Sequence, residues 1–155
     1  MQTAQDVKLA YFFHGDLTLD MPQPVGPGPH GNRMVFRVVS GTVDGPRLKG
    51  VTMPMSGDWA IIRSDGCGEL DVRSTIKTDD EQLIYMHYRG LMHGTPDTMN
   101  AMFQGKQIPA ADLYLRVAAF FETGSPKYAW VNKIVGVGTA TVGIPKFNLD
   151  MYIVE

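Results

Sequence analysis

The sequence predicts an all-β protein, built as one closed or nearly closed antiparallel β-barrel of about eight to nine strands. Short segments rich in Val, Ile, Tyr, Phe and Thr recur along the chain, and most of them alternate apolar with polar residues. The 17 glycines and 10 prolines fall largely between these segments and mark turns. Closure is expected because a barrel leaves no strand edge unpaired.

The expected elements follow in chain order. Strands are predicted at 6–18, 33–43, 47–52, 58–64, 69–78, 82–91, 112–123, 128–141 and 146–154. Residues 22–31, rich in proline and glycine, are predicted to form a loop. The insert at 95–111 is the only segment with helical character, and we expect one short helix near 97–104, with Asp97 as its cap.

Composition limits the classes of function. The 155 residues suit one domain, 1–155, and 44% hydrophobic with 19% charged residues indicates a globular chain. A net charge of −2 argues against nucleic acid as a partner. Cys67 is the only cysteine and no metal-ligand spacing occurs, so neither a metal nor a cofactor is expected. Without a signal-peptide pattern or a membrane-spanning run, a cytoplasmic protein is the expectation.

Strand 112–123 has two faces of different character. One face is wholly apolar and consists of Leu113, Leu115, Val117, Ala119 and Phe121. The other consists of Tyr114, Arg116, Ala118, Phe120 and Glu122. Two faces suited to burial fit a barrel wall with a cavity inside and a helix or second subunit outside. If the apolar face lies outside it predicts a homo-oligomer, and if inside it is simply core. Solvation of Arg116 and Glu122 is the competing interpretation.

The neighbouring strands carry the best acid–base candidates. Asp71 and Arg73 alternate with apolar residues, so patterning alone places them in water as a weak ion pair. In the opposite orientation they would lie in the barrel lumen and could orient a carbonyl or carboxylate. His87, mid-strand on a rigid element, is the histidine best placed for proton transfer, with a structural role as the alternative.

Residues 128–135 also alternate as a strand would. Tyr128, Trp130 and Asn132 fall on one face, which combines apolar area with hydrogen-bonding groups and suits a small-molecule pocket. A tryptophan packed in the core is the alternative interpretation.

Several spaced motifs, in order, resemble the domain-of-unknown-function family 3237 of bacteria and fungi over about residues 6–155. These motifs are 41–50 (GTVDGPRLKG), 57–59 (GDW), 65–66 (DG), 70–73 (LDVR), 78–80 (TDD), 121–124 (FETG), 128–132 (YAWVN) and the ending at Tyr152. The resemblance implies a small antiparallel barrel similar to allene oxide cyclase and other calycin-like barrels. It also implies a lumen position for Arg73 and Arg116. The Met-rich segment 91–111 is longer than the usual family connection.

These observations support two hypotheses of function. The first is a cofactor-independent lyase, isomerase or cyclase that acts on a small carbonyl or phenolic metabolite by acid–base chemistry. The second is a non-catalytic, lipocalin-like carrier, which the methionines favour. The candidate catalytic residues are Asp71, Arg73, Glu122, Arg116, Tyr128 and His87. The candidate substrate-binding residues are Asp58, Trp59, Tyr88, Phe120, Trp130 and Asn132.

Overall fold

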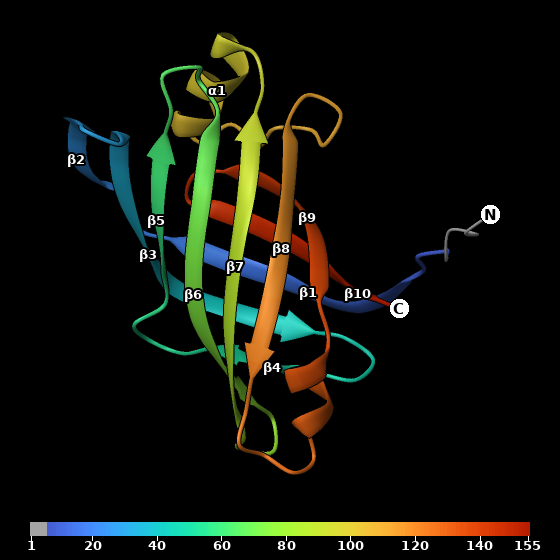
Figure 1. Cartoon of the computed structure of the whole chain (residues 1–155). Helices are drawn as coiled ribbons and strands as arrows, with labels where there is room; N and C mark the ends of the chain where they lie inside the picture. Colours follow the sequence, from blue (N-terminus) through green and yellow to red (C-terminus); the bar gives the residue numbers. More distant parts are fainter. Residues whose placement is uncertain (1–5) are drawn as a thin grey trace.

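A computed structural model describes residues 6–155 and contains ten strands, one α-helix and one 3₁₀-helix (Figure 1). The strands are β1 (Leu9–Leu19), β2 (Gln23–Gly28), β3 (Gly31–Asp44), β4 (Lys49–Thr52), β5 (Gly57–Ile62), β6 (Gly68–Thr78), β7 (Leu83–His93), β8 (Tyr114–Glu122), β9 (Gly136–Gly143) and β10 (Lys146–Val154). The helices are α1 (Pro96–Phe103) and η1 (Ala129–Lys133).

The strands form a closed antiparallel barrel of eight strands with two further strands, which confirms the predicted fold class. The order β1-β10-β9-β8-β7-β6-β4-β3 is closed by pairing of β1 with β3. Strands β4 and β5 both lie between β3 and β6, β4 toward one end and β5 toward the other. Strand β2 pairs with β3 outside the ring as a hairpin.

The barrel lumen is the hydrophobic core. Strand β8 shows the rule, because its inward residues are buried and its outward residues exposed in strict alternation. The wholly apolar face of 113–121 is therefore core, and it gives no support to an oligomer. A register shift between Tyr11 and Phe13 on β1 turns both Phe12 and Phe13 inward, where they pack ring to ring.

Helical segments close the two ends of the barrel. At one end, α1 and the chain after it cover the opening, and Met102 and Ile108 are buried there (Figure 1). The backbone N–H of Ile144 donates to the carbonyl oxygen of Met102 at 3.2 Å, which ties α1 to the sheet. At the other end, η1 packs beneath the lumen with Val131 fully buried.

Three local predictions were wrong. Residues 23–28 form β2, because the glycines, two of them at positive φ, allow a hairpin within the proline-rich segment. Residues 129–133 form the 3₁₀-helix η1, and strand β9 begins only at Gly136. Helix α1 is capped by Thr95, whose hydroxyl accepts the N–H of Thr98, while Asp97 lies in the first turn.

Candidate functional site

Asp58 is a carboxylate that points into the barrel lumen. On β5 it lies in register with Phe36 of β3 and Val72 of β6, both of which are buried. Pairing of β5 with β6 is interrupted after Asp58 and resumes at Ile61. Asp58 Oδ1 accepts the N–H of Asp71 at 2.9 Å, so the side chain occupies a backbone donor beside the interruption.

Burial raises the pKa of Asp58 to about 7. Desolvation is the main cause, and the negative charge of Asp71 raises the pKa further. The N–H of Asp71 and the charge of Arg33 act in the opposite direction and are outweighed. A carboxyl group with such a pKa is populated in both protonation states at neutral pH, which is the condition that general acid–base catalysis requires.

A small chamber lies in the lumen beside Asp58, at the α1 end. Its volume is about 40 Å³, enough for a few water molecules. Its lining is apolar apart from two carboxylates, and comprises Leu19, Met34, Phe36, Asp58, Ala60, Ile62, Gly68, Glu69, Leu70, Met92, Met102, Phe103, Val142, Ile144 and Phe147. Asp58 is therefore presented at the inner end of an apolar recess.

Tyr88 is a further titratable group of the lumen. It lies on β7 opposite Val72, which separates it from Asp58 along one row of the sheet. It borders a further void of about 20 Å³ deeper in the barrel. Burial, followed by the charge of Asp58, raises the pKa of the Tyr88 hydroxyl, which is therefore neutral and able to donate a hydrogen bond.

A larger groove, which we call the vestibule, lies outside the chamber between α1 and the β5–β6 turn. Its volume is about 910 Å³. Its lining residues are Asn32, Met34, Ile62, Arg63, Asp65, Gly66, Cys67, Leu91, His93, Gly94, Pro96, Met99, Asn100 and Phe103. Met34, Ile62 and Phe103 line both spaces, so they form the partition between the vestibule and Asp58. Methionine adapts its shape readily, which suits a partition that must yield to a ligand.

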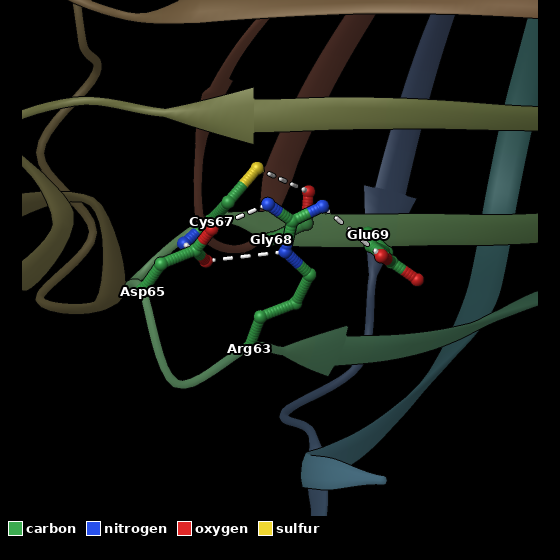
Figure 2. Close-up of polar contacts among 5 residues, drawn as sticks. All are labelled: Arg63, Asp65, Cys67, Gly68 and Glu69. Atoms are coloured by element: carbon green, nitrogen blue, oxygen red, sulfur yellow. Dashed lines mark hydrogen bonds and ion pairs between the residues drawn. The ribbon is translucent and has the colours of Figure 1, made fainter.

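The β5–β6 turn forms a braced wall of the vestibule. Figure 2 shows Arg63 reaching across the turn, where its guanidinium pairs with Asp65 and lies 3.3 Å from Glu69. Asp65 also accepts the N–H of Cys67 at 3.1 Å, and Gly66 adopts a positive φ that completes the turn. Hydrogen bonding to Arg63 holds the pKa of Asp65 well below its usual range. The arginine at the entrance is thus neutralised by neighbouring carboxylates.

The lumen position that the resemblance implied for Arg73 is wrong, and Asp71 lies on the solvent side that the alternation of its strand predicted. Both project from the outer surface of β6, because Val72 and Ser74 occupy the inward positions. The Asp71 carboxylate lies 2.9 Å from His87 Nε2 and 3.6 Å from Arg73 Nη2. Trp59 projects outward from β5, with the Arg73 guanidinium 5.7 Å from its ring centroid.

The lumen position implied for Arg116 is likewise wrong, and the competing interpretation, solvation of Arg116 and Glu122, is correct. Arg116, Phe120 and Glu122 lie on the outer surface and are exposed. Arg116 Nη1 donates to the carbonyl oxygen of Leu115 at 2.9 Å and to Thr139 Oγ1 at 3.0 Å. The face that carries these residues is the outside of the barrel, because the wholly apolar face fills the lumen.

Tyr128, Trp130 and Asn132 do not form the predicted strand face, because this segment is the helix η1. Tyr128 donates its hydroxyl to Asp80 at 2.9 Å, and Asn132 donates to and accepts from the backbone of Thr123. Trp130 packs edge to face on Phe12, with the guanidinium of Arg47 at 3.6 Å from its ring. All three residues close the barrel end opposite to Asp58.

Of the twelve candidates, only Asp58 and Tyr88 lie in the lumen, and the partition of Met34, Ile62 and Phe103 was not predicted. Asp58 shares its strand face with Ala60 and Ile62, and this alternation was the available signal for an inward carboxylate. In residues 6–155, no group of three or more His, Cys, Asp or Glu side chains is arranged to hold a metal ion. Within the same residues, no helix has the length and apolar character needed to cross a bilayer.

A family model described as a protein of unknown function (DUF3237) matches residues 7–154. The chain belongs to this family. A UPF0311 protein of Clostridium acetobutylicum is 33% identical over 116 residues, which cover 74% of this chain and 73% of that protein. The resemblance predicted from the ordered motifs is confirmed.

Two solved structures show the same fold. A β-barrel-like protein of Acinetobacter baumannii is 29% identical with a TM-score of 0.83, and the match covers all of both chains. A protein described as an enzyme from Penicillium herquei is 18% identical with a TM-score of 0.76, over 100% of this chain and 99% of that one. At that identity the likeness to the fungal protein is one of fold.

Proposed function

We propose that this protein is a cofactor-independent enzyme that transfers protons on a small carbonyl or phenolic compound, with Asp58 as the general base. The observation that carries the proposal is a lumen carboxylate whose pKa is raised to about 7, at the inner end of a recess that opens toward a groove of about 910 Å³. A base of this pKa accepts a proton at neutral pH and returns it within the same turnover.

The chemistry needs a base, a group that holds the developing oxyanion and a site with little water. Asp58 is the base in this proposal. The side-chain amides of Asn32 and Asn100 are hydrogen-bond donors in the vestibule, and the neutral hydroxyl of Tyr88 is a donor at the separate void deeper in the barrel. The apolar lining supports exclusion of water once a ligand has displaced the partition.

The fold adds independent support at a coarse level. The Penicillium herquei protein that shares this barrel is described as an enzyme, so the architecture can host chemistry. Isomerisation, cyclisation and elimination of water all begin with the proton transfer proposed for Asp58, and all remain within the proposal.

Exchange of solvent deuterium tests the proposal without knowledge of the natural substrate. The protein is incubated in D₂O with a panel of enolisable aryl ketones and phenols, and incorporation of deuterium is followed by NMR. We expect the wild type to accelerate exchange for compounds that fit the vestibule, with a rate that rises through a pH of about 7 as Asp58 ionises. Asp58→Asn is expected to lower that rate at least about 100-fold.

Asp71→Asn is the matched control, because Asp71 lies one hydrogen bond from Asp58 but on the outer surface. This variant is expected to keep most of the exchange activity. Equal exchange by the wild type and Asp58→Asn would overturn the assignment of the base.

A carrier without chemistry is the second candidate, and the methionines around the recess favour it. Met34, Met92, Met99 and Met102 border the chamber or the vestibule and would adapt to varied apolar ligands. A carrier would bind members of the same panel, with shifts in the NMR signals of these methyl groups, and would exchange no deuterium.

A further inference from the structure

The outer surface of β6, β7 and β8 is a mixed aromatic and charged face, unlike the charged surface expected of a strand washed by water. Apolar and aromatic side chains are exposed on it and on the adjoining β5: Trp59, Leu83, Tyr85, Leu91, Tyr114 and Phe120. Phe120 is 59% exposed. Arginine and aromatic residues together are the composition of the centre of protein–protein interfaces.

The strand registers give this face an internal symmetry. Val72, Tyr88 and Ala119 lie side by side in one row across the three strands. Consider a second copy related to the first by a two-fold axis that runs along this row, just above the sheet. Each strand of one copy then lies over the same strand of the other copy, in the reverse direction. An outward residue on one side of the row therefore faces the residue of the second copy that lies at equal distance on the other side of the row. The resulting facing pairs are Asp71 with Arg73, His87 with Arg89, Leu91 with Tyr85, Ala118 with Phe120, and Arg116 with Glu122.

We propose that the protein forms a two-fold symmetric dimer in which the outer faces of β6–β8 of two copies pack against each other around the row Val72–Tyr88–Ala119. A contact of this type is isologous, since every pair occurs twice, once in each direction. Two sheets packed face to face lie about 10 Å apart, which the facing side chains fill.

Charge complementarity supports a second copy as the occupant. Arg116 of one copy faces Glu122 of the other, and Asp71 faces Arg73 of the other. The bonds that Arg116 makes within residues 6–155 engage its Nη1 atom, so Nε and Nη2 are available to a carboxylate. Opposite charges on the two sides of the row, Asp71 and Arg73 on β6 and Arg116 and Glu122 on β8, favour one relative direction of the two sheets.

Shape complementarity supports the same arrangement. A hollow of about 400 Å³ lies on the face, lined in part by Leu91, Arg116 and Ala118. The exposed ring of Phe120 from the second copy faces Ala118, so a large aromatic side chain meets the smallest outward side chain of β8. This pairing would bury the ring in the hollow, in the manner of an aromatic anchor at the centre of an interface.

The electrostatic interaction in one facing pair is less favourable than in the two ion pairs. His87 faces Arg89 of the second copy, and a protonated His87 would place two cations together. Asp71 lies 2.9 Å from His87 Nε2 and is in register with Arg89 of its own chain, so a carboxylate stands beside both groups. The pair is therefore tolerated, and most of the affinity is expected from Phe120 and the outer ion pairs.

The size of the face predicts a dimer of moderate strength. At the usual strand spacing, three strands of this length present about 400 Å², and inclusion of β5 and β9 raises this to about 700 Å² per copy. A standard stable interface uses about 800 Å² per partner. We therefore expect a dissociation constant on the order of 10 µM.

Sedimentation velocity across about 1 to 500 µM tests the dimer, and variants test its symmetry. Arg116→Glu and Glu122→Arg are each expected to weaken self-association at least about 10-fold, because each places like charges opposite one another. A mixture of the two single variants is expected to form a heterodimer, since both facing pairs then become opposite in charge. The double variant Arg116→Glu/Glu122→Arg is expected to recover the homodimer for the same reason.

Ala118→Leu and Arg37→Glu complete the test. Ala118→Leu fills the hollow that receives Phe120 and is expected to abolish the dimer, while Arg37→Glu on the exposed surface of β3 is expected to leave it intact. Circular dichroism melts establish that each variant is folded. The proposal would be overturned if the wild type sediments as a monomer at every concentration. It would also be overturned if Arg116→Glu and Glu122→Arg both dimerise as strongly as the wild type.

Discussion

Asp58 and Asp71 are joined by one hydrogen bond across neighbouring strands, yet they occupy opposite sides of the barrel wall. Asp58 faces the apolar lumen, and burial raises its pKa to about 7. Asp71 faces outward, where a histidine and an arginine approach its carboxylate. The contrast shows that the side of the sheet, and so the access to water, decides whether a carboxylate of this barrel is suited to chemistry or to surface pairing.

The largest effect on stability is expected from Asp58→Asn as a function of pH. The native pKa of Asp58, about 7, lies above the value of about 4 in the unfolded chain, so the native state holds this proton more tightly. The free energy of unfolding of the wild type therefore falls as pH rises from about 4 to about 7, by up to about 4 kcal/mol from this group. Asparagine retains the hydrogen-bond acceptor and removes this fall.

Urea unfolding of the wild type and of Asp58→Asn between pH 4.5 and pH 8 measures the effect. The two curves should converge at the acid end and separate in favour of the variant as pH rises. Asp71→Asn should keep the fall in stability seen in the wild type. Parallel curves for the wild type and Asp58→Asn would mean that Asp58 is not shielded from water.

The next largest effect on stability is expected at helix α1, which covers the chamber. Met102 on α1 is buried against the lumen, so Met102→Ala is expected to lower the free energy of unfolding by about 3 kcal/mol through lost burial and a new cavity. Met55, which is 94% exposed, supplies the control, since Met55→Ala should change stability by less than about 0.5 kcal/mol. Equal effects in urea unfolding would show that α1 does not close the barrel.

The smallest effect is expected on the outer side of the wall. Removal of the Asp71 to His87 contact by His87→Ala should cost less than about 1 kcal/mol, because both side chains are partly exposed to water. Monomeric protein in dilute solution is used, so that self-association does not contribute. A loss comparable to that of Met102→Ala would mean that the outer contact organises the sheet.

The fold class follows from the sequence because period-two alternation and turn residues are local signals. Which face of each strand points into the lumen does not follow from the sequence. The wall of a small barrel can carry mixed residues on both sides, and a shift of the strand register by one residue exchanges the two faces. The resemblance therefore decided the position of Arg116 and placed it wrongly in the lumen, although the alternation along β8 was itself correct. A wholly apolar face was the better guide to the inside.

The candidate site was predictable in part. Asp58 was a candidate only through the motif at 57–59, and its raised pKa depends on burial by neighbouring strands, where Phe36 and Val72 are in register with it. The partition of Met34, Ile62 and Phe103 combines three distant segments and leaves no local pattern. Helix η1 was mistaken for a strand because Tyr, Trp and Val also favour strands, and tertiary packing of Trp130 on Phe12 decides the outcome.

The central claim is that Asp58 is a shielded carboxylate that exchanges a proton near neutral pH. Titration of the side-chain carboxyl carbons by NMR, on protein labelled with ¹³C-aspartate, measures this directly, and Asp58→Asn assigns the signal. The structure predicts a midpoint near pH 7 for Asp58. A midpoint near 4, the value of an aspartate in water, would contradict the claim and remove Asp58 as the proposed base.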